Sequence, residues 1–312
     1  VNPMVSHGHN IAMANPGHVL KRVAAHGQFW VIDPRKSESA AFANHHMAPI
    51  AGQDFAILAH CVRALLEQSE GQSAQPVQGL DALRMAVAPY TLDHAAALSG
   101  VAADQIAALA AMVVSGGPVV VETGTGVTMA ASANVTQWLA WTIMILTGAM
   151  NRPGGVWFHP GFLQPMDAGP LPIIADVRHP GAPSRPDIPG MLGEWPCAAL
   201  ADEIESGSIR AVINLGGAML RSFPERDRLA RALSHLDVLA SFEIIANDTT
   251  ALSTHILPTK GQLERPDLSL WDMLSSRVSA AYTPAILPVR GDRRSAWWIG
   301  AIRFRGLQAS GF

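Results

Sequence analysis

Amphipathic helices alternate with short apolar strands along most of this chain, and this alternation constrains its fold more than any other feature. A helix predicted over 18–26 is followed by a strand over 29–32, and a helix over 104–114 is followed by a strand over 119–121. The same order returns after residue 197. Apolar residues three and four positions apart indicate helices with one buried face, and short apolar runs indicate covered strands. The sequence therefore predicts an α/β fold with parallel sheets covered by helices.

A chain of 312 residues has room for two such lobes, because domains average roughly 100–200 residues. We predict a first Rossmann-like lobe over 1–155 and a second over 197–312. Ten prolines and little periodicity occur between residues 151 and 196. Because a long stretch without regular structure usually carries function, we expect 156–196 to be a loop segment that lines a site.

Charged residues make up only 15% of the chain, against about 25% in an ordinary soluble domain. Much of the surface is therefore expected to be uncharged or covered by other protein. A net charge of −3 offers no basic face to a nucleic acid. The longest apolar run, 138–150, is shorter than the roughly 20 residues of a membrane span.

The ends of the chain suggest a piece of a longer protein. The first residue is Val1, and a last amphipathic helix begins at Trp297 without an obvious closing element. We therefore expect the second lobe to be cut short. No targeting segment is apparent, so we expect a cytoplasmic protein, or a periplasmic one if a twin-arginine signal lies upstream.

Four turns occur at predicted strand ends, where parallel sheets bind ligands and helix N-termini attract phosphates. They are Asn2-Pro3, Asp33-Pro34-Arg35, Gly124-Thr125-Gly126 and Gly216-Gly217. Each alone also fits an ordinary turn. The Asp33 carboxylate could accept two parallel hydrogen bonds from a guanine base, and Arg35 could meet a phosphate or close an ion pair. The glycine fingerprints of ordinary ATP and NAD sites are absent.

Further motifs follow in order along the chain. They are Gly52-Gln53-Asp54, the segment 146–155 that contains Leu-Thr-Gly and Arg-Pro-Gly-Gly, Asn214–Gly217 followed by Ser222–Glu225, and Asp248-Thr249. Together with the four turns, they resemble the molybdopterin oxidoreductases of the dimethyl sulfoxide reductase type. That family includes formate dehydrogenases and nitrate, thiosulfate and arsenate enzymes. The resemblance covers nearly the whole chain.

This resemblance implies a fragment that binds the guanine dinucleotide ends of a paired molybdopterin cofactor carrying molybdenum, with tungsten as the other possible metal. The parent enzyme would move an oxygen atom or hydride equivalent and two electrons between a small substrate and an electron-transfer partner or subunit. By the resemblance, one dinucleotide is bound by Asn2, Asp33, Asp54 and Gly124, and the neighbouring Arg35 and Gly126 contribute to the same site. The other is served by Gly216, Gly217, Ser222, Asp248 and Thr249.

Several parts of the family pattern have no counterpart here. The N-terminal iron–sulfur domain, the protein ligand to molybdenum and the closing β-barrel are not found, so no catalytic or metal-ligating residue is predicted. Any iron–sulfur cluster would belong to the missing N-terminal domain. Cys61 and Cys197 both fit buried thiols. The Arg that formate dehydrogenases carry after the Pro-Gly-Gly stretch is absent, which argues against formate as the substrate.

Histidines offer little further evidence of a site. His7 and His9 have the spacing of two metal ligands on a strand, but no third ligand is nearby. We expect His45 and His46 to lie on a solvated turn.

A non-catalytic scaffold of the same fold, as in the large peripheral subunit of respiratory complex I, is the alternative. Ala218-Met219 and Ser253-Thr254 replace cofactor-binding motifs of the family and favour that alternative. The intact Asp33-Pro34-Arg35 turn argues against it. In either case, we expect the 312 residues alone to be inactive.

Overall fold

A computed structural model describes residues 15–68, 77–115, 117–162, 178–268 and 277–301. The chain divides into two compact units. Unit 1 is Val1–Pro160 with Met273–Val278, and unit 2 is Gly161–Asp272 with Ser279–Phe312. Parallel strands pair within each unit and helices pack against them, which confirms the predicted α/β class.

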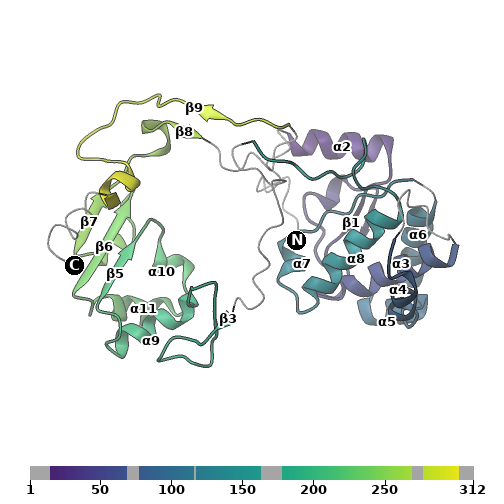
Figure 1. The fold of residues 1–312 in the computed structure, drawn as a ribbon, viewed down its shortest axis with the longest axis horizontal. Helices are drawn as coiled ribbons and strands as arrows, with labels where there is room; N and C mark the ends of the chain where they lie inside the picture. Colours follow the sequence, from purple (N-terminus) through teal and green to yellow (C-terminus); the bar gives the residue numbers. More distant parts are fainter. Residues whose placement is uncertain (1–14, 69–76, 116, 163–177, 269–276, 302–312) are drawn as a thin grey trace. The chain divides into compact units, whose positions relative to one another are not determined.

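Most of the helices of unit 1 pack around a core centred on α3 (Figure 1). They are α2 (Pro16–His26), α3 (Asp54–Gln68), α4 (Leu80–Val87), α5 (Leu92–Ser99), α6 (Ala103–Val114), α7 (Thr125–Thr128) and α8 (Ala133–Leu146). Ile57, Cys61 and Val62 of α3 are fully buried among side chains of α5, α6 and α8. Among the described helices, none alone is long and apolar enough to cross a membrane, and α5 with α6 meets that test only as a pair bent by 120°.

Two strands of unit 1, β1 (Trp30–Ile32) and β2 (His45–Met47), pair in parallel and place Val31 opposite His46. The 3-10 helix η1 (Ala40–Phe42) lies in their connection. The solvated turn expected at His45 and His46 is therefore wrong, because both residues lie in a strand. The predicted strand over 119–121 forms no ladder with the described residues, although the N–H of Val119 donates to Oγ1 of Thr147 at 3.2 Å.

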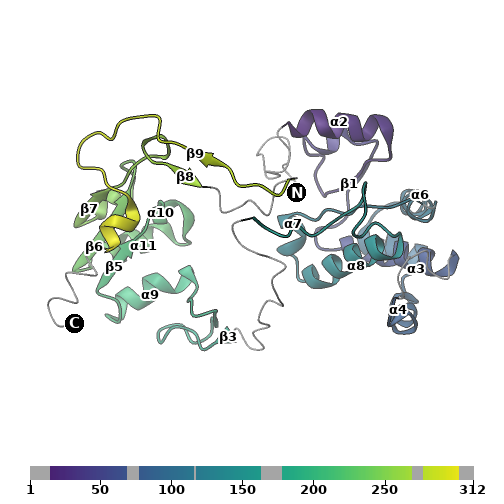
Figure 2. The same ribbon diagram turned by 45° about the horizontal axis from the view of Figure 1, so that its top comes forward.

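Unit 2 contains a three-stranded parallel sheet in the order β5-β6-β7 (Figure 2). Its main elements are α9 (Leu200–Glu205), β5 (Ala211–Asn214), α10 (Met219–Ser222), α11 (Arg226–Leu233), β6 (Val238–Glu243) and β7 (His255–Pro258). Its shorter elements are β3 (Arg178–His179), β4 (Gly190–Met191), η2 (Cys197–Ala199), η3 (Thr250–Leu252), η4 (Gln262–Glu264), β8 (Asp267–Leu268) and β9 (Tyr282–Thr283).

One face of the β5-β6-β7 sheet carries the core of unit 2. Val212 lies opposite Leu239 in the register, and both pack with Ile204 of α9 and Leu229 of α11. Ile213, which points to the other face, is 66% exposed. The described residues thus cover one face of the sheet more fully than the other.

Part of the proline-rich segment forms a hairpin, in which β3 and β4 pair antiparallel. The hairpin is fixed to the helices of unit 2, because Oε1 of the buried Glu203 accepts the N–H of Ser184 at 2.7 Å. Asp202 also pairs with Arg185 of the hairpin and with Arg228 of α11. The hydrogen bond from Arg228 lowers the pKa of Asp202. These residues, expected to form a loop that lines a site, are therefore anchored to α9 and α11.

Candidate functional site

Asp33 directly follows β1 and is 1% exposed. Its N–H donates to the carbonyl of Met47 at 3.0 Å, and its carbonyl lies 2.9 Å from Nε2 of His46. Its Oδ1 accepts the backbone N–H of Arg35 at 2.8 Å, which is the contact of an Asx turn. Asp33 is closed to solvent, so a base could reach its carboxylate only after the neighbouring groups had moved.

Arg35 lies two residues further along the same turn and has a different environment. Its guanidinium is 3.6 Å from the carboxylate of Glu38, and the two side chains are 58% and 51% exposed. Ion pairs this exposed contribute little to stability. Both Asp33 and Arg35 were expected to bind the cofactor. Asp33 is buried, whereas the side chain of Arg35 lies on the surface.

Asp54 begins α3 and is half-buried. Burial raises its pKa above the ordinary value, and the charge of Asp33 raises it further. The preceding Gly52 has φ +83°, and its carbonyl accepts a hydrogen bond from Oγ of Ser132 at 2.7 Å. The structure thus brings Asp54 into the electrostatic environment of Asp33, and places its turn beside the segment that leads into α8.

Gly124 and Gly126 lie at the start of α7, a helix of one turn. Gly124 is the N-cap and is extended, with φ −112°, so no left-handed conformation requires glycine there. The hydroxyl of Thr123 donates to Oε1 of Gln137 in α8, which ties this turn to the longer helix. Gly126 is exposed.

Gly216 and Gly217 follow β5 and have φ values of +89° and +98°. A Cβ added to Gly217 would meet nothing within 4 Å, so backbone conformation and not space favours glycine there. The N–H of Gly217 donates to Oε2 of Glu243 at 2.9 Å. The backbone amide of Gly217, a residue that the resemblance assigns to the cofactor, thus has a protein partner.

The remaining predicted residues of unit 2 gather around α10. Thr249 is fully buried, and its Oγ1 accepts the N–H of Leu220 at 3.3 Å. Asp248 lies 3.0 Å from Arg226 and 3.6 Å from Arg221, two exposed cations. Ser222 is the last residue of α10 and is exposed.

Two residues that the sequence interpretation missed connect this group. Glu243 ends β6 and accepts hydrogen bonds from Gly217, from the N–H of Ile244 at 3.0 Å and from Nδ2 of Asn247 at 3.3 Å. Oδ1 of Asn247 accepts the N–H of Thr249 at 2.9 Å. An Asn two residues before a Thr pair is a typical start of a short helix and could have been recognised. The contact of Glu243 with Gly217 joins residues 26 positions apart, so no local pattern indicates it.

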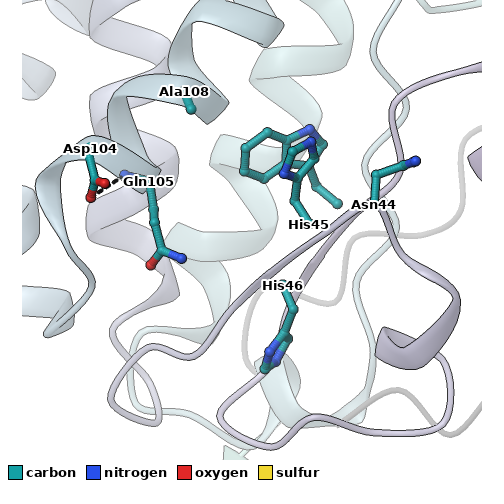
Figure 3. Close-up of a pocket in the computed structure, with 7 residues that line it drawn as sticks. Asn44, His45, His46, Asp104, Gln105 and Ala108 are labelled. Atoms are coloured by element: carbon teal, nitrogen blue, oxygen red, sulfur yellow. Dashed lines mark hydrogen bonds between the residues drawn. The ribbon is translucent and has the colours of Figure 1, made fainter.

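A pocket of about 330 Å³ lies between the strands of unit 1 and α6 (Figure 3). It is lined by Trp30, Asn44, His45, His46, Asp104, Gln105 and Ala108. The rings of Trp30 and His45 are stacked, with centroids 4.0 Å apart. Nε1 of Trp30 is buried and has no hydrogen-bond partner among the described residues. None of the predicted site residues that the structure describes lines this pocket.

No group of three or more His, Cys, Asp or Glu side chains suited to a metal ion occurs among the described residues. The predicted Asn2 lies outside the part of the chain that the structure describes, as do His7 and His9. Cys61 is buried as expected, whereas Cys197 is exposed at the start of η2, so the expectation of a buried thiol is wrong there.

Comparison with known proteins gives a consistent result. The family model for molybdopterin oxidoreductase matches residues 4–301. Formate dehydrogenase H of Escherichia coli is 24% identical over 279 residues, which are 81% of this chain and 38% of that protein. The alpha subunit of NADPH-Fe(3+) oxidoreductase of Geobacter sulfurreducens is 25% identical over 271 residues, which are 82% of this chain and 31% of that protein.

A solved structure shares the fold. Acetylene hydratase from Pelobacter acetylenicus superimposes with a TM-score of 0.65 at 14% sequence identity, over 90% of this chain and 43% of that one. The chain spans about a third of the length of the curated relatives it matches.

Proposed function

This chain belongs to the molybdopterin oxidoreductase family, and we propose that it is the part of a molybdenum enzyme that holds the cofactor by two guanine dinucleotide ends. The match over residues 4–301 carries the proposal, because it includes both units and all but one of the predicted binding residues. The whole enzyme would transfer an oxygen atom or a hydride equivalent and two electrons to or from a small substrate.

The residues of unit 1 fit the guanine end of such a cofactor in their chemistry. Asp33 and Asp54 supply carboxylates, which accept hydrogen bonds from the N–H groups on one edge of guanine. Burial is the main cause of the raised pKa of Asp54, and repulsion from the charge of Asp33 adds a smaller increase. A ligand that brings N–H donors to this pair would relieve that repulsion.

The residues of unit 2 fit a diphosphate. Arg221 and Arg226 are exposed cations at the carboxyl end of the sheet, next to Asp248. Gly216 and Gly217 leave space at the same end, because their turn carries no side chain. Glu243 would compete with a phosphate for the N–H of Gly217, so we expect its carboxylate to move when a dinucleotide binds.

The bound metal and pterins would supply the two-electron chemistry. The residues of this chain would bind and orient the cofactor. Asp33 and Asp54 would accept from the purine, while Arg221 and Arg226 would offset the negative charge of the phosphates. Burial of Asp33 would strengthen its hydrogen bonds by excluding water from them.

We also propose the partners and location of the whole protein. The Geobacter relative is named as a subunit, which supports an electron-transfer partner or companion subunit for this protein too. The same proposal allows tungsten as the metal in place of molybdenum. It also places any iron–sulfur cluster of the whole protein outside these residues. A cytoplasmic location stays a prediction.

A scaffold of the same fold that has lost the cofactor is the second candidate. Two observations favour it: the 1% exposure of Asp33 and the bond between Gly217 and Glu243. Both place predicted cofactor-binding groups in contact with other parts of the chain.

Nucleotide release separates the two candidates. The chain would be purified from a host that makes the cofactor, hydrolysed in acid and analysed for GMP, molybdenum and tungsten. We expect up to about two GMP per chain, and less GMP from matched variants Asp33→Asn and Asp248→Asn, because each removes a charged acceptor from one unit. Arg185→Gln on the hairpin is the control. Absence of GMP from the unaltered chain would favour the scaffold.

A further inference from the structure

The backbone at Asp33 is held on both sides by the next strand. Its N–H donates to the carbonyl of Met47, and its carbonyl contacts Nε2 of His46, at 3.0 and 2.9 Å. The first bond continues the ladder between β1 and β2. The second comes from a side chain and adds a restraint at the point where β1 ends and the turn begins.

The register explains how His46 reaches this carbonyl. His46 lies opposite Val31, so its side chain is on the face of the sheet that also carries the side chains of Val31 and Asp33. Figure 3 shows its ring pointing away from His45 and Ala108. A carbonyl oxygen can only accept, so Nε2 of His46 carries the hydrogen, which fixes the tautomer of a neutral ring.

The restraint extends to the carboxylate of Asp33. The direction of its side chain depends on the φ and ψ angles of Asp33. The bond from its N–H to Met47 restricts φ, and the contact of its carbonyl with His46 restricts ψ. Oδ1 then meets the N–H of Arg35 at 2.8 Å. A change in the carbonyl orientation would rotate the following peptide and disturb this contact.

We propose that His46 is a positioning residue for the binding of guanine in unit 1. It holds the Asp33-Pro34-Arg35 turn in the conformation that fixes the carboxylate of Asp33. The inference rests on the proposed function in naming guanine as the ligand, whereas the restraint on the turn rests on the contacts alone.

The experiment uses the full 312-residue chain with His46→Gln, which keeps an N–H donor at the same reach, and His46→Leu, which removes it. His45→Leu is the matched control, because Nε2 of His45 contacts the side chain of Gln28 at 3.3 Å and not Asp33. Three quantities are measured: the His46 tautomer by nitrogen NMR, the exchange rate of the Arg35 amide, and the affinity for guanosine 5′-diphosphate with adenosine 5′-diphosphate as comparison.

We expect the ring of His46 to carry a hydrogen at Nε2. We expect His46→Leu to speed exchange of the Arg35 amide and weaken binding of guanosine diphosphate by up to about tenfold, the effect of losing one hydrogen bond. His46→Gln should stay close to the unaltered chain in both respects, as should His45→Leu.

Equal behaviour of the Gln and Leu variants, or a ring protonated only at Nδ1, would overturn the positioning role. If the unaltered chain binds the guanosine and adenosine diphosphates equally, guanine recognition in the proposed function fails. In that case, exchange of the Arg35 amide still tests whether His46 holds the turn. If the amide stays protected in His46→Gln and loses protection in His46→Leu, His46 acts on the turn. Equal protection in the two variants contradicts that action.

Discussion

At the scale of single residues, Asp33 and Asp248 show how burial changes the way a carboxylate can bind a ligand. Asp33 is 1% exposed and is held by backbone groups of its own turn, whereas Asp248 pairs with two exposed arginines. A buried carboxylate gives strong hydrogen bonds to a ligand that reaches it, but excludes ligands that cannot displace its cover. An exposed one is reached easily and discriminates less. The two units therefore present different kinds of acid to the proposed cofactor.

Asp54 is predicted to reduce stability at neutral pH. Its pKa is raised in the folded chain, mainly by burial, so the folded state binds this proton more tightly than the unfolded state. Stability should therefore rise as the pH falls through the folded pKa. Asp54→Asn removes the cost of the charge and should raise Tm at pH 7 by about 1–3 °C. The gain should shrink as the pH is lowered towards 4.

Thermal unfolding followed by circular dichroism between pH 4 and 8 measures this effect. Asp104→Asn is the matched control, because Asp104 also lies in the first turn of a helix but is exposed. It should leave Tm unchanged or lower it slightly, since an acid there interacts favourably with the helix N-terminus. A lower Tm for Asp54→Asn at pH 7 would contradict the destabilising role of this carboxylate.

At the scale of elements, the β5-β6-β7 sheet has two unequal faces. Leu239 of β6 is fully buried against α9 and α11, while Ile213 of the adjacent β5 is 66% exposed on the opposite face. Parallel sheets are normally covered on both faces. The stability of unit 2 should therefore depend mainly on the face that carries the helices.

Truncation of the two side chains tests that dependence. Leu239→Ala should lower the free energy of unfolding by about 2–5 kcal/mol, because it removes buried surface and leaves a cavity. Ile213→Ala should cost below about 1 kcal/mol, because most of its side chain is already in water. Urea denaturation measures both. Equal losses would mean that the face of Ile213 is covered in solution.

At the scale of the whole molecule, the chain represents about a third of the relatives it matches. By the family resemblance, the protein ligand to molybdenum and the closing β-barrel have no counterpart in these 312 residues. We therefore expect purified chain to show no reduction of a viologen dye with formate and no oxidation of the reduced dye with nitrate. Formate dehydrogenase H of Escherichia coli serves as the positive control with formate. Turnover that depends on either substrate would contradict this prediction.

Local patterns predict the elements of this fold well. Helices α2 and α6 and strand β1 lie within a few residues of the predicted ranges 18–26, 104–114 and 29–32, and the alternation of helices and strands returns after residue 197 as predicted. Helices α4, α5 and α10 were missed, because short runs of eight residues or fewer give weak periodicity. Val119–Val121 has the composition of a strand, but strand pairing requires a partner that composition does not specify.

The order of helices and strands, the turns at strand ends and the family resemblance follow from the sequence by itself, because they depend on residues close together in the chain. Tertiary structure alone decided that His45 and His46 form a strand beside β1, that Asp33 is closed off from solvent, and that Glu243 meets the amide of Gly217. Each of these outcomes depends on hydrogen bonds or burial between distant residues. Such contacts exist only once the apolar faces have packed.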